Sequence, residues 1–140
     1  MPLERSAFLG PGDEAPRPHH NCYWLVPGRL LAGQHPGGRG VSDVAGNVAA
    51  LLASGIRQTL DLTSPGEGLT DYDPLMVQQA VALGASAQVH RAPVADFSIP
   101  DTRRMRWVLD HLHAALDGGP PLYLHCHGGI GRTGTAIGCL

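Results

Sequence analysis

One stretch of the sequence decides the fold: Leu122-Tyr123-Leu124-His125-Cys126-His127-Gly128-Gly129-Ile130-Gly131-Arg132-Thr133. It opens with a short apolar run that is typical of a buried β-strand, and a loop with three glycines follows at once. The residues after Arg132 are compatible with a helix. In α/β proteins, ligands bind just outside the carboxyl ends of strands, so we expect a ligand-binding loop here.

The rest of the chain supplies further strands and helices around this one. Periodicity and turn signals predict strands at 23–26, 29–32, 56–63 and 89–91, and helices at 42–54, 73–84 and from 101 or 102 to about 116. Ser42 is the expected cap of the first helix and Gly55 its stop. Because strands alternate with helices after residue 42, the fold class is α/β, with a central, mostly parallel sheet flanked by helices.

The length of 140 residues is that of one domain, and a hydrophobic content of 43% is enough for a core. Residues 1–20 mix prolines and glycines with charges, which predicts a flexible N-terminal arm. We therefore divide the chain into this arm and a folded domain over residues 21–140.

Charge and cysteine content exclude several classes of protein. The net charge of −2 argues against a protein that binds nucleic acid or membrane surfaces in general. No apolar run approaches the roughly 20 residues that a bilayer span needs, and the N-terminus lacks a secretory signal. Three cysteines are too few for a disulfide framework, so a cytoplasmic location is expected. Cys22 and Cys139 are interpreted as core thiols.

The loop itself points to anion chemistry. Glycines at 128, 129 and 131 permit backbone angles that let successive N–H groups turn inward, and the following helix N-terminus adds partial positive charge. Arg132 can hold two phosphate oxygens as a fork. Cys126 would then lie beneath the bound phosphate, where these dipoles lower the pKa of its thiol and make it a nucleophile.

His-Cys, five residues and Arg-Thr after a strand resemble the signature of the protein-tyrosine phosphatase superfamily, in particular its dual-specificity branch. The loop is similar to that of the cyclin-dependent-kinase-associated phosphatases, and residues 23–33 resemble bacterial phosphatase-like proteins. The resemblance covers about residues 21–140 and implies a phosphatase-like fold. In that family further helices follow the loop helix, so residues 133–140 predict a domain truncated at its C-terminus.

The resemblance also assigns roles to individual residues. Asp96, in Pro93-Val94-Ala95-Asp96-Phe97-Ser98-Ile99-Pro100, corresponds to the family's general acid, whereas Asp101 suits a helix cap better. Cys126 is the nucleophile and Arg132 binds phosphate; His125 orients the loop and Thr133 is expected near the thiolate. The residues expected to contact substrate are His127, Gly128, Gly129, Ile130 and Gly131. Asp61, near the end of a strand, could line the cleft, although a cap or solvent-facing role is the preferred interpretation.

These residues predict a cysteine-dependent phosphatase that hydrolyses phosphomonoesters through a phosphocysteine intermediate. Its substrate would be a phosphorylated protein, on tyrosine or on serine and threonine, or a small phosphomonoester. Two alternatives stay open: an inactive phosphate-binding module and a rhodanese-like sulfurtransferase. No cofactor is expected, and no metal, because His125 and His127 flank Cys126 at a spacing that matches no zinc site. The oligomeric state is open.

Overall fold

The computed structural model describes residues 17–19, 21–38, 43–94 and 100–140. At its centre is a five-stranded sheet in the order β1-β2-β5-β3-β4. The strands are β1 Cys22–Val26, β2 Leu30–Gln34, β3 Gln58–Asp61, β4 Gln88–Arg91 and β5 Leu122–Cys126. Only the β1–β2 pair is antiparallel, so the predicted α/β class with a mostly parallel sheet is confirmed.

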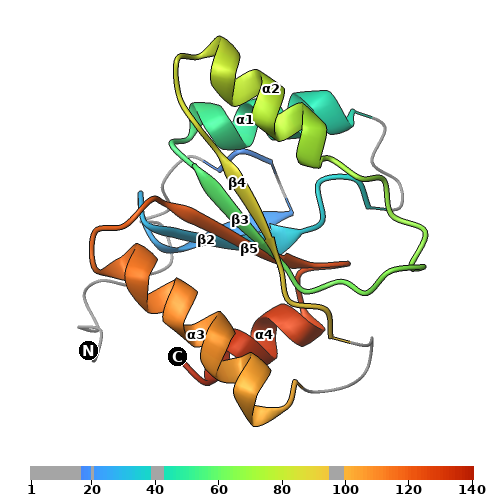
Figure 1. Cartoon of the computed structure of the whole chain (residues 1–140), viewed down its shortest axis with the longest axis vertical. Helices are drawn as coiled ribbons and strands as arrows, with labels where there is room; N and C mark the ends of the chain where they lie inside the picture. Colours follow the sequence, from blue (N-terminus) through green and yellow to red (C-terminus); the bar gives the residue numbers. More distant parts are fainter. Residues whose placement is uncertain (1–16, 20, 39–42, 95–99) are drawn as a thin grey trace.

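Two layers of helices cover this sheet. Helices α1 (Val44–Ala53) and α2 (Asp73–Ala82) lie on one face, and α3 (Thr102–Leu116) and α4 (Gly131–Gly138) lie on the other (Figure 1). β5 is the middle strand, so the loop that follows it opens at the centre of the sheet edge. None of the helices in the described part of the chain is long and apolar enough to cross a membrane.

The helix ends follow from capping chemistry, with one correction. The cap of α1 is Asp43 and not Ser42, which lies outside the described residues: the Asp43 carboxylate accepts a hydrogen bond from the Gly46 N–H at 2.8 Å. The positive end of the helix dipole also stabilises a negatively charged carboxylate, whereas a neutral serine gains no such stabilisation. Asp101 caps α3 as predicted, accepting from the Arg104 N–H at 2.8 Å.

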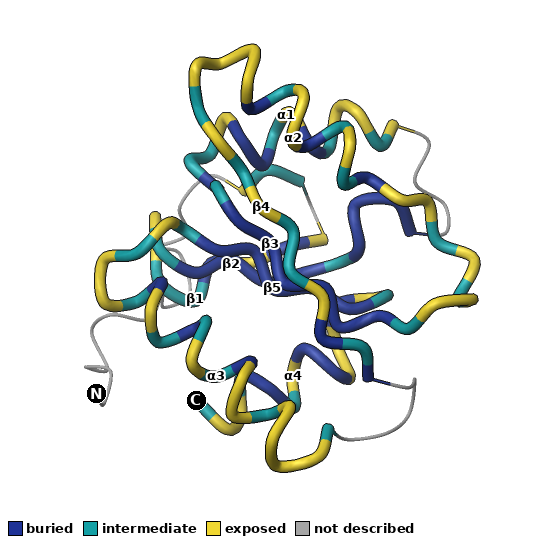
Figure 2. The backbone as a smooth tube through the Cα atoms, viewed as in Figure 1, coloured by how far each residue is buried: buried dark blue, intermediate teal, exposed yellow. Residues whose placement is uncertain are grey.

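Alternation along β5 divides the core into two clusters. Leu122, Leu124 and Cys126 pack toward α3 and α4, whereas Tyr123 packs toward α1 and α2. The strand itself is buried along its whole length between the two helix layers (Figure 2). Cys22 belongs to the second cluster, as expected of a core thiol. Cys139 was also predicted to be a core thiol, and this is wrong: it follows the last residue of α4 and is exposed along an open groove beside α3.

Candidate active site

Cys126 is the last residue of the central strand, and both neighbouring strands hold the backbone around it. The Leu62 N–H donates to the His125 carbonyl at 2.9 Å, and the His35 N–H donates to the His127 carbonyl at 3.1 Å. The loop 127–130 then leads directly into the N-terminus of α4. The cysteine therefore lies at the base of a loop that ends in a helix N-terminus, 3% exposed.

Gly129 is the one loop glycine that the backbone requires. Its φ is +79°, and a Cβ built there would lie 2.3 Å from the carbonyl carbon of Gly33 on β2. Gly128 and Gly131 have neither a positive φ nor a neighbour within 4 Å of such a Cβ. Special backbone angles were predicted for all three loop glycines, and among these only Gly129 needs one, because its backbone lies directly against β2.

Arg132 is 4% exposed, in the first turn of α4, and Glu67 holds it. Nη1 and Nη2 donate to the two carboxylate oxygens of Glu67 at 2.7 and 2.8 Å, and Nη1 also donates to the Val94 carbonyl at 2.9 Å. A helix N-terminus disfavours a cation, so the sequence suggested that a phosphate must compensate Arg132. The structure supplies a carboxylate that already does so, and this carboxylate fixes the direction of the guanidinium fork.

Glu67 was not identified from the sequence, where it lies in a turn between two glycines. Hydrogen bonding to Arg132 lowers the pKa of Glu67, and its Oε2 also accepts from the Ser64 N–H at 2.5 Å. The available signal was its position shortly after β3, because the carboxyl ends of β3 and β5 meet at the same sheet edge. The residues of the turn alone predicted a solvent-exposed Glu67 and did not indicate its contact with Arg132.

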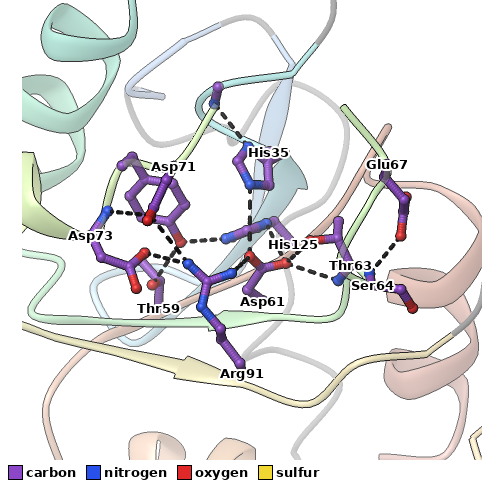
Figure 3. A network of polar contacts seen from close by, with 12 residues as sticks. His35, Thr59, Asp61, Thr63, Ser64, Glu67, Asp71, Asp73, Arg91 and His125 are labelled. Atoms are coloured by element: carbon purple, nitrogen blue, oxygen red, sulfur yellow. Dashed lines mark hydrogen bonds and ion pairs between the residues drawn. The ribbon is translucent and has the colours of Figure 1, made fainter. Parts of the chain in front are cut away.

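His125 is fully buried, and its ring lies beside His35 and Asp61 in a network of polar contacts (Figure 3). The Tyr72 hydroxyl donates to Thr59 Oγ1 at 2.8 Å, and its oxygen lies within hydrogen-bond distance of His125 Nε2, at 2.5 Å. Burial lowers the pKa of His125 to about 3, against the opposing effect of Asp61. A neutral, hydrogen-bonded ring supports the orienting role expected for this residue.

Asp61 is completely buried, so the interpretation as a solvent-facing residue is wrong, whereas its carboxylate does cap a backbone N–H just beyond the end of β3. The carboxyl end of β3 lies inside the sheet, between β5 and β4, and carries the side chain into the interior. Asp61 accepts from the N–H and hydroxyl of Thr63 at 2.8 and 2.5 Å and from Arg91 at 3.0 Å. Burial alone would raise the pKa of Asp61, but hydrogen bonds from His35 and Thr63 hold it well below its usual range.

His35, Asp61 and His125 bring three potential metal-ligand atoms within 4.8 Å of one another. Nδ1 of His35 accepts a hydrogen bond from the Gly37 N–H at 2.9 Å, so the ring hydrogen lies on Nε2, 3.6 Å from Asp61 Oδ2. The His35 N–H thus faces the buried Asp61 carboxylate, whereas His125 Nδ1, 3.8 Å from Asp61 Oδ1, has no hydrogen-bond partner among the described residues. The three residues form a buried polar cluster around Asp61.

The remaining predicted residues divide between the rim and the base of the loop. Thr133 is buried, and its hydroxyl has no hydrogen-bond partner among the described residues. His127 is half-buried, whereas Ile130 is 83% exposed at the rim.

Asp96 lies outside the described residues, and its role as acid stays a prediction. The stem of its segment is fixed: the Val94 N–H donates to the Leu62 carbonyl at 3.0 Å, and the Val94 carbonyl accepts from Arg132. The segment that contains Asp96 therefore starts from a carbonyl bound to the candidate phosphate-binding arginine.

A model of the PTP-SAK family, described as "Swiss Army Knife protein, DSP-PTPase phosphatase domain", matches residues 19–140. The chain belongs to this family. Membership confirms the resemblance to dual-specificity-type phosphatases and gives no support to the sulfurtransferase alternative.

Solved structures show the same fold. P. aeruginosa TpbA is 25% identical with a TM-score of 0.61, over 89% of this chain and 64% of that one. Kinase associated phosphatase (KAP), with its catalytic-site cysteine changed to serine, is 21% identical with a TM-score of 0.62, over 79% and 63%. Tk-PTP in its active form is 19% identical with a TM-score of 0.59, over 77% and 63%. The chain thus spans somewhat less than two thirds of these phosphatases.

Proposed function

We propose that this chain carries the active site of a cysteine-dependent phosphatase that hydrolyses phosphomonoesters of proteins. One observation carries the proposal. Cys126 ends the central strand beneath a loop and helix N-terminus, and the buried Arg132 in that helix is already oriented by Glu67. Membership of a phosphatase domain family supports the same reaction.

The proposed reaction has two steps. Cys126 Sγ attacks phosphorus, an S–P bond forms, the P–O bond to the leaving group breaks, and Asp96 gives that oxygen its proton. Asp96 then takes a proton from water, the water oxygen attacks phosphorus, and the S–P bond breaks to release inorganic phosphate. Arg132 and the N–H groups of residues 127–132 stabilise the equatorial oxygens, and the Thr133 hydroxyl can donate to the departing thiolate.

The substrate class follows from the side chains of the loop. Solved relatives include a TpbA variant in complex with pTyr and PTPMT1 in complex with PI(5)P. Residues 127–131 contain His127 but neither lysine nor arginine, which favours a single phosphoryl group over a highly phosphorylated inositol. We therefore propose phosphotyrosine, phosphoserine or phosphothreonine in proteins as the substrate.

The first experiment is hydrolysis of an aryl phosphate, para-nitrophenyl phosphate, by the parent chain and by Cys126→Ser. Cys139→Ser is the matched control, because Cys139 is exposed beyond the end of α4. We expect Cys126→Ser to lose at least 1,000-fold in kcat, in the range known for removing a covalent nucleophile, and the control to match the parent. Equal turnover in all three proteins would refute the mechanism.

A further inference from the structure

A groove lies beside Pro93, at the start of the segment that follows β4. Its volume is about 290 Å³, and it runs between the end of β4 and the first turns of α3. It is lined by three arginines, one carboxylate and three apolar residues: Arg91, Arg103, Arg104, Asp101, Ala92, Pro93 and Trp107. Three arginines from two separate elements thus face one cavity, although the chain has only ten.

The charges of this groove are not balanced equally. Arg91 forms ion pairs with Asp61, Asp71 and Asp73 at 2.7 to 3.2 Å. Arg103 forms no ion pair within the described residues, and Arg104 donates to the Pro93 carbonyl. Both lie in the first turn of α3, where the helix dipole disfavours cations, and among the described residues at this end of α3 the carboxylate of Asp101 caps the helix. The rim therefore has a positive charge that a bound anion would compensate.

The groove lies close to the candidate phosphate site. Arg104 and Arg132 donate to the carbonyls of Pro93 and Val94, two successive residues. Two hydrogen bonds and one peptide unit separate the guanidinium groups by on the order of 10 Å. An extended peptide advances about 3.3 Å per residue, so that distance corresponds to about two or three residues of substrate.

We propose that this groove is a second anion subsite, which binds a carboxylate or a second phosphate two or three residues from the phosphorylated residue of the same substrate. Arg103 and Arg104 supply the charge, and Trp107 and Pro93 supply apolar walls for the stem of the bound side chain. The inference rests on the proposed phosphatase function and names its substrate class: proteins with a second acidic group near the phosphorylated residue.

The test compares phosphotyrosine peptides that differ at one position. Aspartate, phosphoserine or alanine is placed two or three residues to either side of phosphotyrosine, and kcat/KM for phosphotyrosine hydrolysis is measured for each. We expect a preference over alanine of about three- to ten-fold for aspartate and a larger one for phosphoserine, weakening at high salt. The ratio between these two peptides distinguishes a carboxylate from a phosphate as the preferred anion.

Arg103→Gln is the decisive variant, because Arg104 also holds the stem of the predicted acid loop. We expect it to reduce the acidic-to-alanine ratio to less than two-fold, whereas Arg106→Gln, on the same helix but lining a different groove, keeps the parent ratio. Because each ratio compares kcat/KM for two peptides with the same protein, a general loss of activity in a variant does not change it.

Each outcome decides the subsite. Equal kcat/KM for all peptides, or a preference that survives Arg103→Gln, would overturn it even if para-nitrophenyl phosphate is hydrolysed. If no substrate is hydrolysed, the phosphatase proposal fails, and fluorescence anisotropy of the labelled peptides decides instead. Tighter binding of the acidic peptides that Arg103→Gln abolishes would then support the subsite, and equal binding would overturn it.

Discussion

The charged guanidinium of Arg132 can be buried because Glu67 pairs with it through two parallel hydrogen bonds. The same contact joins three segments, since Glu67 follows β3, Val94 begins the predicted acid segment and Arg132 begins α4. In the proposed mechanism Glu67 is therefore a positioning residue, which sets the direction of the phosphate-binding Arg132.

We expect Glu67→Gln to lower kcat/KM for an aryl phosphate about ten-fold, because a neutral amide holds a guanidinium less firmly than a carboxylate does. Inhibition by inorganic phosphate should weaken in parallel, since it reports on the same fork without chemistry. The control is Asp110→Asn, an exposed carboxylate on α3. Unchanged phosphate inhibition in Glu67→Gln would contradict this role.

His125 makes stability depend on pH. Its folded pKa of about 3 lies below the ordinary 6.5, so between these values the unfolded chain binds a proton that the folded chain does not. The stabilisation is complete above pH 6.5 and is lost as pH falls toward 3, at about 1.4 kcal/mol per pH unit for one proton.

Urea unfolding of the parent and His125→Gln between pH 7 and pH 5 measures this effect. Glutamine can still donate to Tyr72 but does not titrate. We expect the free energy of unfolding to fall less steeply with decreasing pH in the variant than in the parent. The difference in slope should correspond to about one proton, or about 1.4 kcal/mol per pH unit. Identical slopes would mean that His125 is not the buried neutral group described above.

At the scale of the element, the loop between β5 and α4 is held by close approach to β2 at Gly129. Gly129→Ala should cost about 2–4 kcal/mol of unfolding free energy, from a strained positive φ and from overpacking against Gly33, and should abolish activity. Gly128→Ala is the matched control, with open space around its Cβ and no positive φ. Urea unfolding that shows equal stability for the two variants would contradict this geometry.

Elements whose signals are local could be predicted from sequence. Asp73-Pro74 predicts the start of α2 and Asp101 the cap of α3, because capping acts within one turn. The strand predicted at 56–63 is shorter, Gln58–Asp61, because it ends where pairing with β4 and β5 ends.

Side chains whose environment depends on tertiary packing could not be predicted in this way. Asp61 is buried because its strand lies between two others, and Cys139 is exposed because α4 ends before it. Glu67 meets Arg132 across 65 positions of sequence, and no local pattern records that contact.

Across the whole molecule, Cys22 and Cys126 lie on opposite faces of the sheet. Cys22 packs with α1 and α2, and Cys126 packs with α3 and α4. In register, Cys22 pairs with Gly33, and Gly33 pairs with His125, so Cys22 lies two strands from β5. Two strand spacings are about 9.6 Å, beyond the roughly 7 Å that a disulfide tolerates.

Mild oxidation of the folded chain should therefore produce no disulfide between Cys22 and Cys126. Peptide mapping by mass spectrometry under non-reducing conditions checks this, with the urea-unfolded chain as control, in which the same pair is free to form. A Cys22–Cys126 linkage in the folded protein would contradict the assignment of these residues to opposite faces.

The order of strands and helices in the sequence sufficed for the fold class, because alternation after residue 42 permits few arrangements other than a parallel sheet. The sequence also predicted that Cys126 lies at the carboxyl end of a strand, and the structure shows that this strand is the central one. The ion-pair partners at that edge required the structure, since they come from loops whose sequences resemble ordinary turns.

In the proposed reaction Cys126 forms a bond to phosphorus during turnover. The most direct measurement is rapid acid quench of the chain with para-nitrophenyl phosphate, followed by mass spectrometry of the peptide that contains Cys126. We predict one added phosphoryl group on Cys126 in the parent chain and none in Cys126→Ser. Turnover by the parent with the phosphoryl group on another residue, or with no phosphorylated protein and full activity in Cys126→Ser, would contradict the account.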